Sequence, residues 1–279
     1  MSPTSCSDIH LVSPRIRRQA ATVLIVLLAV GSAACGSSSS ASAATSTTSA
    51  PVLSGPITVS AASSLSEVFP ALAIRFESLH PGTTVDFDFG SSGTLAAQIL
   101  SGAPTDVFAA AAPAPMAMVQ AAHLVAGSPT TFTRNRLEIV VKPGNPKRIH
   151  TLADLSKAGI VSLCVVTAPC GATAAKALSD SNVVLAPGTV TLGQDVDATL
   201  AQVTTGDADA GIVYVTNVVA AGTAATGEPI PLRQNVTTSY PIAVLTASSH
   251  GAVAEAWVAF VLGPVGSAAL RRAHFLPAT

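Results

Sequence analysis

Charged side chains are scarce in this sequence. Asp, Glu, Lys and Arg make up 10% of the 279 residues, and the formal net charge is −1. A nucleic-acid-binding protein needs a basic face that neutralises phosphates, so the composition argues against that class. The four cysteines form no Cys-x-x-Cys pair and the histidines do not cluster. A zinc or iron site therefore has no support, and we expect no cofactor.

Aromatic residues are also few, at 4% of the chain, whereas 49% of the residues are hydrophobic. We therefore expect a core built from Ala, Val, Leu and Ile. Only one stretch, close to the N-terminus, is long and apolar enough to resemble a membrane segment.

That stretch is typical of an export signal. A basic cluster, Arg15 to Arg18, precedes an apolar run from Ala20 to Val30, and small residues follow it. These are the parts of a secretory signal, and the run is short for a membrane-spanning helix, which needs roughly 20 apolar residues. We therefore predict that residues 1–34 are a signal peptide and that the protein is exported.

Cys35 follows Ser32-Ala33-Ala34, an arrangement that resembles a bacterial lipoprotein cleavage box, although Leu is commoner than Ser at the first of these positions. We predict a lipid on Cys35 that anchors the protein to the outer face of the cell membrane; the alternative is ordinary cleavage nearby. Residues 36–54 are almost all Ser, Ala and Thr, too polar and simple to fold. Residues 35–56 are therefore predicted to be the anchor and a flexible linker.

From residue 57 onward, strand-like and helix-like segments alternate, which indicates an α/β fold. We expect strands at 57–61, 84–89, 107–110, 136–142, 159–165, 183–185, 211–215 and 240–246. We expect helices at 66–79, 94–101, 115–122, 152–156, 173–179, 195–205, 253–262 and 266–274.

This order fits two α/β lobes with mixed sheets, joined by two chain crossings near 132–137 and 236–241. The first lobe would contain residues 57–133 plus 240–279, and the second residues 134–239. Ligands of α/β proteins commonly bind in a cleft such as the one between these lobes.

Several loops between a strand and a helix have the composition of an anion site. The N-terminus of a helix carries free N–H donors and a partial positive charge, so it can hold an anion without Lys or Arg. Ser64 lies in such a loop, where its simpler role would be a helix cap. Ser92 lies in Gly90-Ser91-Ser92-Gly93, whose glycines allow several N–H groups to point to one place.

Two later loops offer backbone donors. Cys170 lies between Pro169 and Gly171 ahead of a predicted helix; Pro169 fixes the chain direction, and Gly171 permits close approach to a ligand. Val196 opens another predicted helix, and the neighbouring Asp195 and Asp197 must cap that helix or point away. Tyr214, which ends a predicted strand, can add its phenol O–H, although a tyrosine there is usually a packing residue.

In this order and spacing, the loops resemble those of the periplasmic molybdate-binding proteins of ABC importers. The stretches that carry the resemblance are 57–65, 89–99, 102–108, 195–196, 211–214 and 240–244. The resemblance implies a two-lobed periplasmic-binding-protein fold of type II, a bound molybdate or tungstate ion, and an ABC permease as the membrane partner. We expect a monomer.

In that family, two serines, two backbone amides and a tyrosine hydroxyl hold the oxyanion. The resemblance assigns these roles to Ser64, Ser92, Cys170, Val196 and Tyr214, with no direct bond to the metal atom. Ser63 and Ser91 are adjacent hydroxyls, so a shift by one residue stays open.

The family commonly has a small residue near position 170, so the cysteine is a departure. In an exported protein with Cys35 acylated, Cys164 and Cys170 would be the remaining pair. We predict a disulfide between them, worth about 2 kcal/mol for so short a loop. The alternative is two buried thiols.

Other functions fit the sequence less well. An enzyme is disfavoured because no Gly-x-Ser-x-Gly motif is present and no histidine falls in the four loops. The same fold could bind sulfate or a small carboxylate, but a carboxylate usually requires an arginine clamp, and no arginine lies in these loops. A structural surface lipoprotein would not explain the four donor loops.

Overall fold

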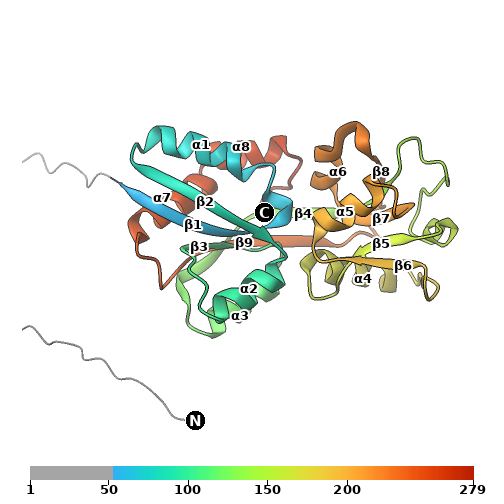
Figure 1. The fold of residues 1–279 in the computed structure, drawn as a ribbon, viewed down its shortest axis with the longest axis horizontal. Coiled ribbons are helices and arrows are strands. Elements are labelled where there is room, and N and C mark those ends of the chain that lie inside the picture. Colours follow the sequence, from blue (N-terminus) through green and yellow to red (C-terminus); the bar gives the residue numbers. More distant parts are fainter. Residues whose placement is uncertain (1–52) are drawn as a thin grey trace, which may run out of the picture. The chain divides into compact units, whose positions relative to one another are not determined.

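Strands and helices alternate along residues 53–279, the part of the chain that this computed structural model describes (Figure 1). The predicted signal peptide, Cys35 and the first part of the linker lie outside the described residues. The described part is an α/β structure with two lobes, which confirms the fold class predicted from the sequence.

The sheet of the first lobe is built mainly from four strands. They are β1 (Gly55–Ala62), β2 (Thr83–Gly90), β3 (Val107–Ala109) and β9 (Thr237–Leu245). β1 is parallel to both β2 and β3, whereas β9 is antiparallel to β3. Five helices cover the sheet: α1 (Phe69–Leu79), α2 (Ser92–Leu100), α3 (Pro113–Ala121), α7 (Gly251–Leu262) and α8 (Pro264–Arg272).

Helices lie on both faces of this sheet because its strands are apolar on both faces. In β3, Val107 and Ala109 join the core under α1, α7 and α8, whereas Phe108 joins the core under α2 and α3 (Figure 1). This alternation follows from the two-residue period of a strand.

The first core contradicts one expectation from composition. Phe69, Phe76 and Trp257 are fully buried there, and Trp257 meets both phenylalanine rings edge-on. A core of Ala, Val, Leu and Ile is therefore wrong for the first lobe. The few aromatics are concentrated in one place, where each buries a large area.

The second lobe has its own core and a mixed sheet. Its strands are β5 (Val161–Cys164), β6 (Val190–Gly193), β7 (Ala210–Tyr214) and β8 (Thr226–Pro229), together with the C-terminal part of β4 (Val125–Val141). Its helices are α4 (Pro169–Asp180), α5 (Val196–Thr204), α6 (Val215–Ala221) and the short 3-10 helices η2 (Ala153–Lys157) and η3 (Gly222–Ala224).

One strand, β4, runs through both sheets. Its residues from Val125 to Arg136 pair with β9, and those from Leu137 to Val141 pair with β7 and β8. The sequence predicted only the second half of this strand. The first half contains Gly127 and Pro129 and two irregularities in its register, which hide the strand pattern.

The predicted strand at 183–185 is wrong, and the strand of this region is β6. The Val183 N–H bonds to the Leu178 carbonyl at 2.9 Å and so closes the end of α4, while the side chain of Val184 is 90% exposed. α6 and β8 were not predicted, because seven and four residues are too short for a clear pattern.

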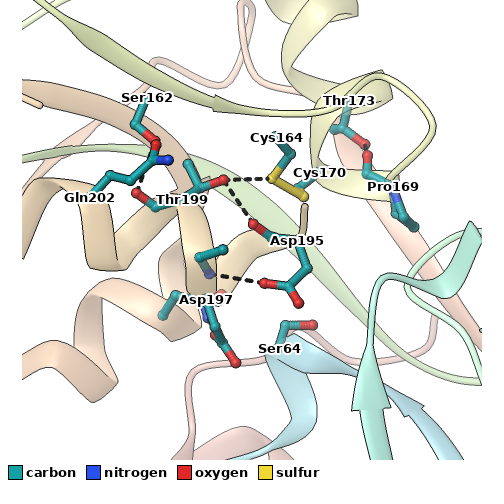
Figure 2. The surroundings of a disulfide bond; sticks show 12 residues. Ser64, Ser162, Cys164, Pro169, Cys170, Thr173, Asp195, Asp197, Thr199 and Gln202 are labelled. Atoms are coloured by element: carbon teal, nitrogen blue, oxygen red, sulfur yellow. Dashed lines mark hydrogen bonds between the residues drawn. A yellow bond between two sulfur atoms is a disulfide. The ribbon is translucent and has the colours of Figure 1, made fainter. Parts of the chain in front are cut away.

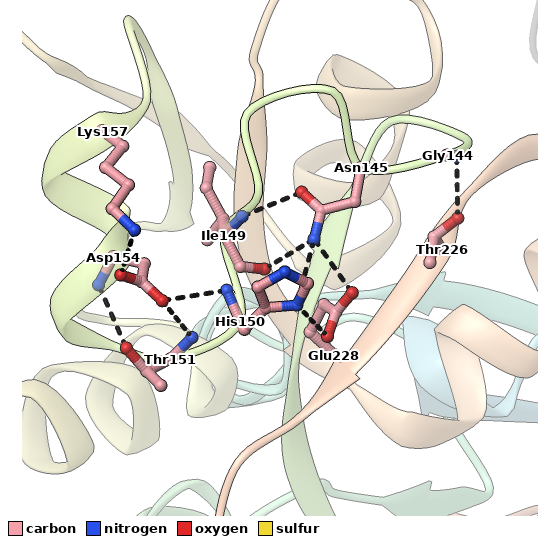
Figure 3. A network of polar contacts seen from close by, with 9 residues as sticks. All are labelled: Gly144, Asn145, Ile149, His150, Thr151, Asp154, Lys157, Thr226 and Glu228. Carbon is pink, nitrogen blue, oxygen red and sulfur yellow. Dashed lines mark hydrogen bonds and ion pairs between the residues drawn. The ribbon is translucent and has the colours of Figure 1, made fainter.

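A polar network fixes the loop after β4, at the end of the second lobe away from the first (Figure 3). The Asn145 side chain accepts from the Ile149 N–H and donates to the Ile149 carbonyl, both at 2.9 Å. It also donates to Glu228 at 2.9 Å, and His150 Nδ1 lies 3.0 Å from the same carboxylate. These residues hold the loop against β8 in place of regular structure.

Among residues 53–279, no single helix is long and apolar enough to cross a membrane. α7 and α8, bent by 55°, meet that criterion only as a pair, by length and composition.

Candidate ligand-binding site

A small cavity lies where loops of both lobes meet. The residues around it enclose about 190 Å³ of space not filled by protein atoms, a volume that includes open solvent. Its lining includes Ala62, Ser63, Ser64, Gly90, Ser91, Ser92, Ala111, Ala168, Pro169, Cys170, Asp195, Val196 and Tyr214. The structure thus brings together all five residues that the sequence suggested as ligands, from positions far apart in the chain. It also places the adjacent Ser63 and Ser91 on the cavity wall.

Ser92 is the first residue of α2 and is almost fully buried. Its Oγ accepts a hydrogen bond from the Ala111 N–H at 2.9 Å. A backbone N–H can only donate, so this bond uses a lone pair of Ser92 and leaves the hydroxyl proton available. Ser92 is thereby prepared as a donor toward the cavity.

Ser64 lies in a 3-10 turn, η1 (Ser63–Leu65), rather than at the start of a helix. α1 begins only at Phe69, so the expected helix from residue 66 is wrong in its first turn, and Ser64 is not its cap. Its Oγ lies 2.8 Å from the phenol oxygen of Tyr240. The sequence places Tyr240 in the 240–244 stretch of the resemblance but predicts no role for it at the site, because it lies in an apolar strand 176 residues from Ser64.

Cys170 and Val196 occupy the first turns of α4 and α5. The first N–H groups of a helix have no partner within it, so these two amides are free to bind an anion. Asp195 caps α5 by accepting from the Ala198 N–H at 2.9 Å (Figure 2). The expectation that Asp195 would cap that helix is confirmed.

Cys164, at the end of β5, forms a disulfide with Cys170 (Figure 2). The bond links the first turn of α4 to the sheet of the second lobe, and Thr199 of α5 donates to the Cys164 sulfur at 3.2 Å. Gly171 has a different role from the expected one. An added Cβ would lie 2.0 Å from the Val165 carbonyl oxygen, so this glycine permits close approach of two protein segments and does not line the cavity.

Tyr214 ends β7 with its side chain 1% exposed. Its hydroxyl has no hydrogen-bond partner among residues 53–279. Burial raises the pKa of Tyr214 well above its usual value, so the phenol keeps its proton. An unpartnered buried donor is costly, and a ligand in the cavity would supply its acceptor.

One carboxylate near the site is perturbed. Burial, and then the charge of Asp195, raise the pKa of Asp197 to about 6. Its oxygens accept from Ser66 of the first lobe at 3.2 Å and from Asn217 of α6 at 2.7 Å. Asp197 therefore points away from the cavity and links the two lobes.

Residues 57–276 match the family of bacterial extracellular solute-binding proteins. The chain belongs to this family. Among curated proteins, the solute-binding protein is 38% identical over 220 residues to the molybdate-binding protein ModA of Mycobacterium tuberculosis. The aligned region covers 78% of this chain and 84% of that protein. It is 29% identical over 233 residues to the ModA of Escherichia coli, covering 79% and 89% of the two chains.

Solved structures share the fold. The solute-binding protein resembles the periplasmic molybdate-binding protein of Azotobacter vinelandii with a TM-score of 0.71 and 21% identity, over 79% of this chain and 98% of that one. It also resembles the sulfate-binding protein SubI of Mycobacterium tuberculosis with a TM-score of 0.72 and 20% identity, over 80% and 86%. Its family is one of transport proteins rather than of enzymes.

Proposed function

We propose that this solute-binding protein captures molybdate or tungstate outside the cytoplasm and delivers it to an ABC importer. The observation that carries the proposal is the convergence of two serine hydroxyls, two helix N-termini and an unpartnered phenol on one small cavity. The ModA relatives, named for molybdate, support the same solute.

The proposed ligands are Ser64, Ser92, Cys170, Val196 and Tyr214, the cysteine and the valine through their backbone N–H groups. All are neutral donors, so they suit an oxyanion that carries no proton. Phosphate near neutral pH carries one, and burying that O–H without an acceptor costs roughly 1–3 kcal/mol. Asp195 lies on the cavity wall, but its carboxylate is engaged at the start of α5.

Capture works by closure of two lobes, residues 57–133 plus 240–279 and residues 134–239. Donors from both lobes bind the same ion, so the ion stabilises the closed form over the open one. The Ser66–Asp197 hydrogen bond between the lobes supports this view. The protein works as a monomer, without a cofactor and without catalysis, and the closed form docks on the permease.

The solute is tested by calorimetric titration of the purified protein with molybdate, tungstate, sulfate and phosphate. Tight one-to-one binding of the first two, with the last two weak, is the expected result. Sulfate is the second candidate, because SubI shares the fold and sulfate also carries no proton at neutral pH. Heat with sulfate alone would replace molybdate by sulfate, and no heat with any of the four would remove the oxyanion function.

The anchor is tested separately. A lipid on Cys35, after removal of residues 1–34, places the protein on the membrane, and the Ser, Ala and Thr tract gives it reach. Mass spectrometry of the membrane-bound protein should find an acylated Cys35 at its N-terminus. Cys35→Ala should release the protein, whereas a variant that still fractionates with the membrane would exclude this anchor.

A further inference from the structure

Behind Ser64, three polar side chains form a buried chain that ends at the cavity. Asn135 of β4 lies with its Nδ2 3.3 Å from the Tyr240 hydroxyl, and that hydroxyl lies 2.8 Å from Ser64 Oγ. Asn135 and Tyr240 are fully buried and neither lines the cavity. They cannot touch a ligand there, so any influence they have on it passes through Ser64.

The direction of every bond in this chain can be assigned. The Asn135 Oδ1 accepts from the Arg136 N–H at 2.9 Å, which identifies the other atom of the amide as the NH₂ group. That group donates to Thr216 Oγ1 at 2.9 Å and to the Tyr240 oxygen. Tyr240 is therefore an acceptor from Asn135.

The remaining step assigns the direction of the hydrogen bond between Tyr240 and Ser64. The two side chains that the structure places in hydrogen bonds with the Tyr240 hydroxyl are Ser64 and Asn135, and of these two only Ser64 can accept the Tyr240 proton, because Asn135 is a donor. If Ser64 donated to Tyr240, the phenol proton would be buried without a partner. Burial also raises the pKa of Tyr240 above its usual value, so this proton stays in place at neutral pH. Tyr240 thus donates to Ser64, and the Ser64 proton is left for the cavity.

From this geometry we infer that Tyr240 is a positioning and specificity-determining residue, which holds the Ser64 hydroxyl as a donor and so selects oxyanions without a proton. The inference rests on the proposed function. Without Tyr240, Ser64 could rotate and offer a lone pair to the O–H of hydrogen phosphate or hydrogen arsenate. Selectivity therefore originates in Tyr240 of β9, which lies directly behind Ser64 and does not touch the ligand itself.

The test is a calorimetric double-mutant cycle on the complete protein with Tyr240→Phe, Ser64→Ala and the double variant, titrated with molybdate and with arsenate. Tyr240→Phe should weaken molybdate binding by about tenfold and lower the molybdate-to-arsenate affinity ratio by at least as much. In the Ser64→Ala background the same substitution should change either affinity by less than about twofold. A merely structural role of Tyr240 would give equal losses in both backgrounds.

Thr216→Val is the matched control. It removes another buried hydroxyl bonded to Asn135, but one that lies off the path to Ser64. Its affinity ratio should stay within about twofold of the unmodified protein.

Asn135→Asp keeps the inference testable if Tyr240→Phe does not fold. A carboxylate at 135 accepts the phenol proton, so Tyr240 then accepts from Ser64, and Ser64 turns a lone pair to the cavity. The added negative charge weakens both dianions alike, whereas the molybdate-to-arsenate ratio should fall by about tenfold or more. Failure of the unmodified protein to bind molybdate would overturn the proposed function. Tight binding whose selectivity survives both substitutions would overturn this inference alone.

Discussion

The two tyrosines of this chain lie close together, yet removing one hydroxyl from each should have different effects on folding. Their ring centres are 6.1 Å apart and both are buried. The Tyr214 hydroxyl has no partner within residues 53–279, whereas that of Tyr240 bonds to Ser64 and Asn135. Substitution by Phe removes one oxygen in each case and leaves the ring packing alone.

The expected changes in stability and affinity follow from the hydrogen-bond partners of the two hydroxyls. Tyr214→Phe breaks no bond in the free protein, so its free energy of unfolding should stay equal or rise by up to about 1 kcal/mol. Tyr240→Phe leaves two buried polar groups short of a partner, which should lower that free energy by about 1–3 kcal/mol. With ligand, Tyr214→Phe loses a hydrogen bond to a charged group, worth about 1.5–3 kcal/mol, so affinity should fall by about 10-fold to 100-fold.

Urea unfolding followed by circular dichroism gives the first quantity, and calorimetric titration with molybdate gives the second. Stability and affinity should thus move independently for Tyr214→Phe, with folding preserved and binding lost. If Tyr214→Phe destabilised the free protein as much as Tyr240→Phe, or left the affinity unchanged, the phenol would not be a donor held in reserve for the ligand.

Three further changes test the surroundings of the site. Burial raises the pKa of Asp197 to about 6, so this carboxyl group binds a proton more tightly in the folded protein than in the unfolded chain. The protonated carboxyl group therefore contributes stability below pH about 4, and this contribution is lost as the pH rises through about 6. Asp197→Asn should remove that loss, on the order of 2 kcal/mol, in urea unfolding measured from pH 4 to 8. Replacing Cys164 and Cys170 by Ala should lower the free energy of unfolding by about 2 kcal/mol, and reductant should do the same to the unmodified protein but nothing to the variant. Gly93→Ala should weaken molybdate binding by about tenfold without destabilising the free protein. The added Cβ would lie 2.4 Å from the Thr167 carbonyl oxygen of the other lobe and would therefore oppose closure of the lobes. An equally large loss of unfolding free energy would instead indicate that the substitution strains the first lobe.

Much of the site could be predicted because its donors are local features of sequence. A helix start is marked by short polar residues or glycine after a strand, and its free N–H groups follow from helix geometry alone. Ser92, Cys170 and Val196 were found in this way, and the structure places all three on the cavity wall.

The groups behind those donors could not be found from sequence, because their roles depend on contacts between distant segments. Tyr240 meets Ser64 across 176 residues and Asn135 across 105. Tyr240 and Asn135 both lie in strands that look purely structural in the sequence. The prediction for Gly171 is wrong for the same reason. A glycine beside a predicted ligand residue suggests access for the ligand, whereas the nearest atom to an added Cβ is the carbonyl oxygen of Val165.

The cavity wall combines hydroxyls, backbone amides, a phenol and the capping carboxylate of Asp195, with no Lys or Arg. Under the proposed function, a doubly charged ion is held there by dipoles alone. Binding of the ion then displaces no counterions from a basic patch on the protein, so salt acts on the affinity only by screening the free ion in solution. Release of the ion follows the same principle. When the lobes open, water replaces the hydroxyls and amides one by one, and no ion pair has to be broken.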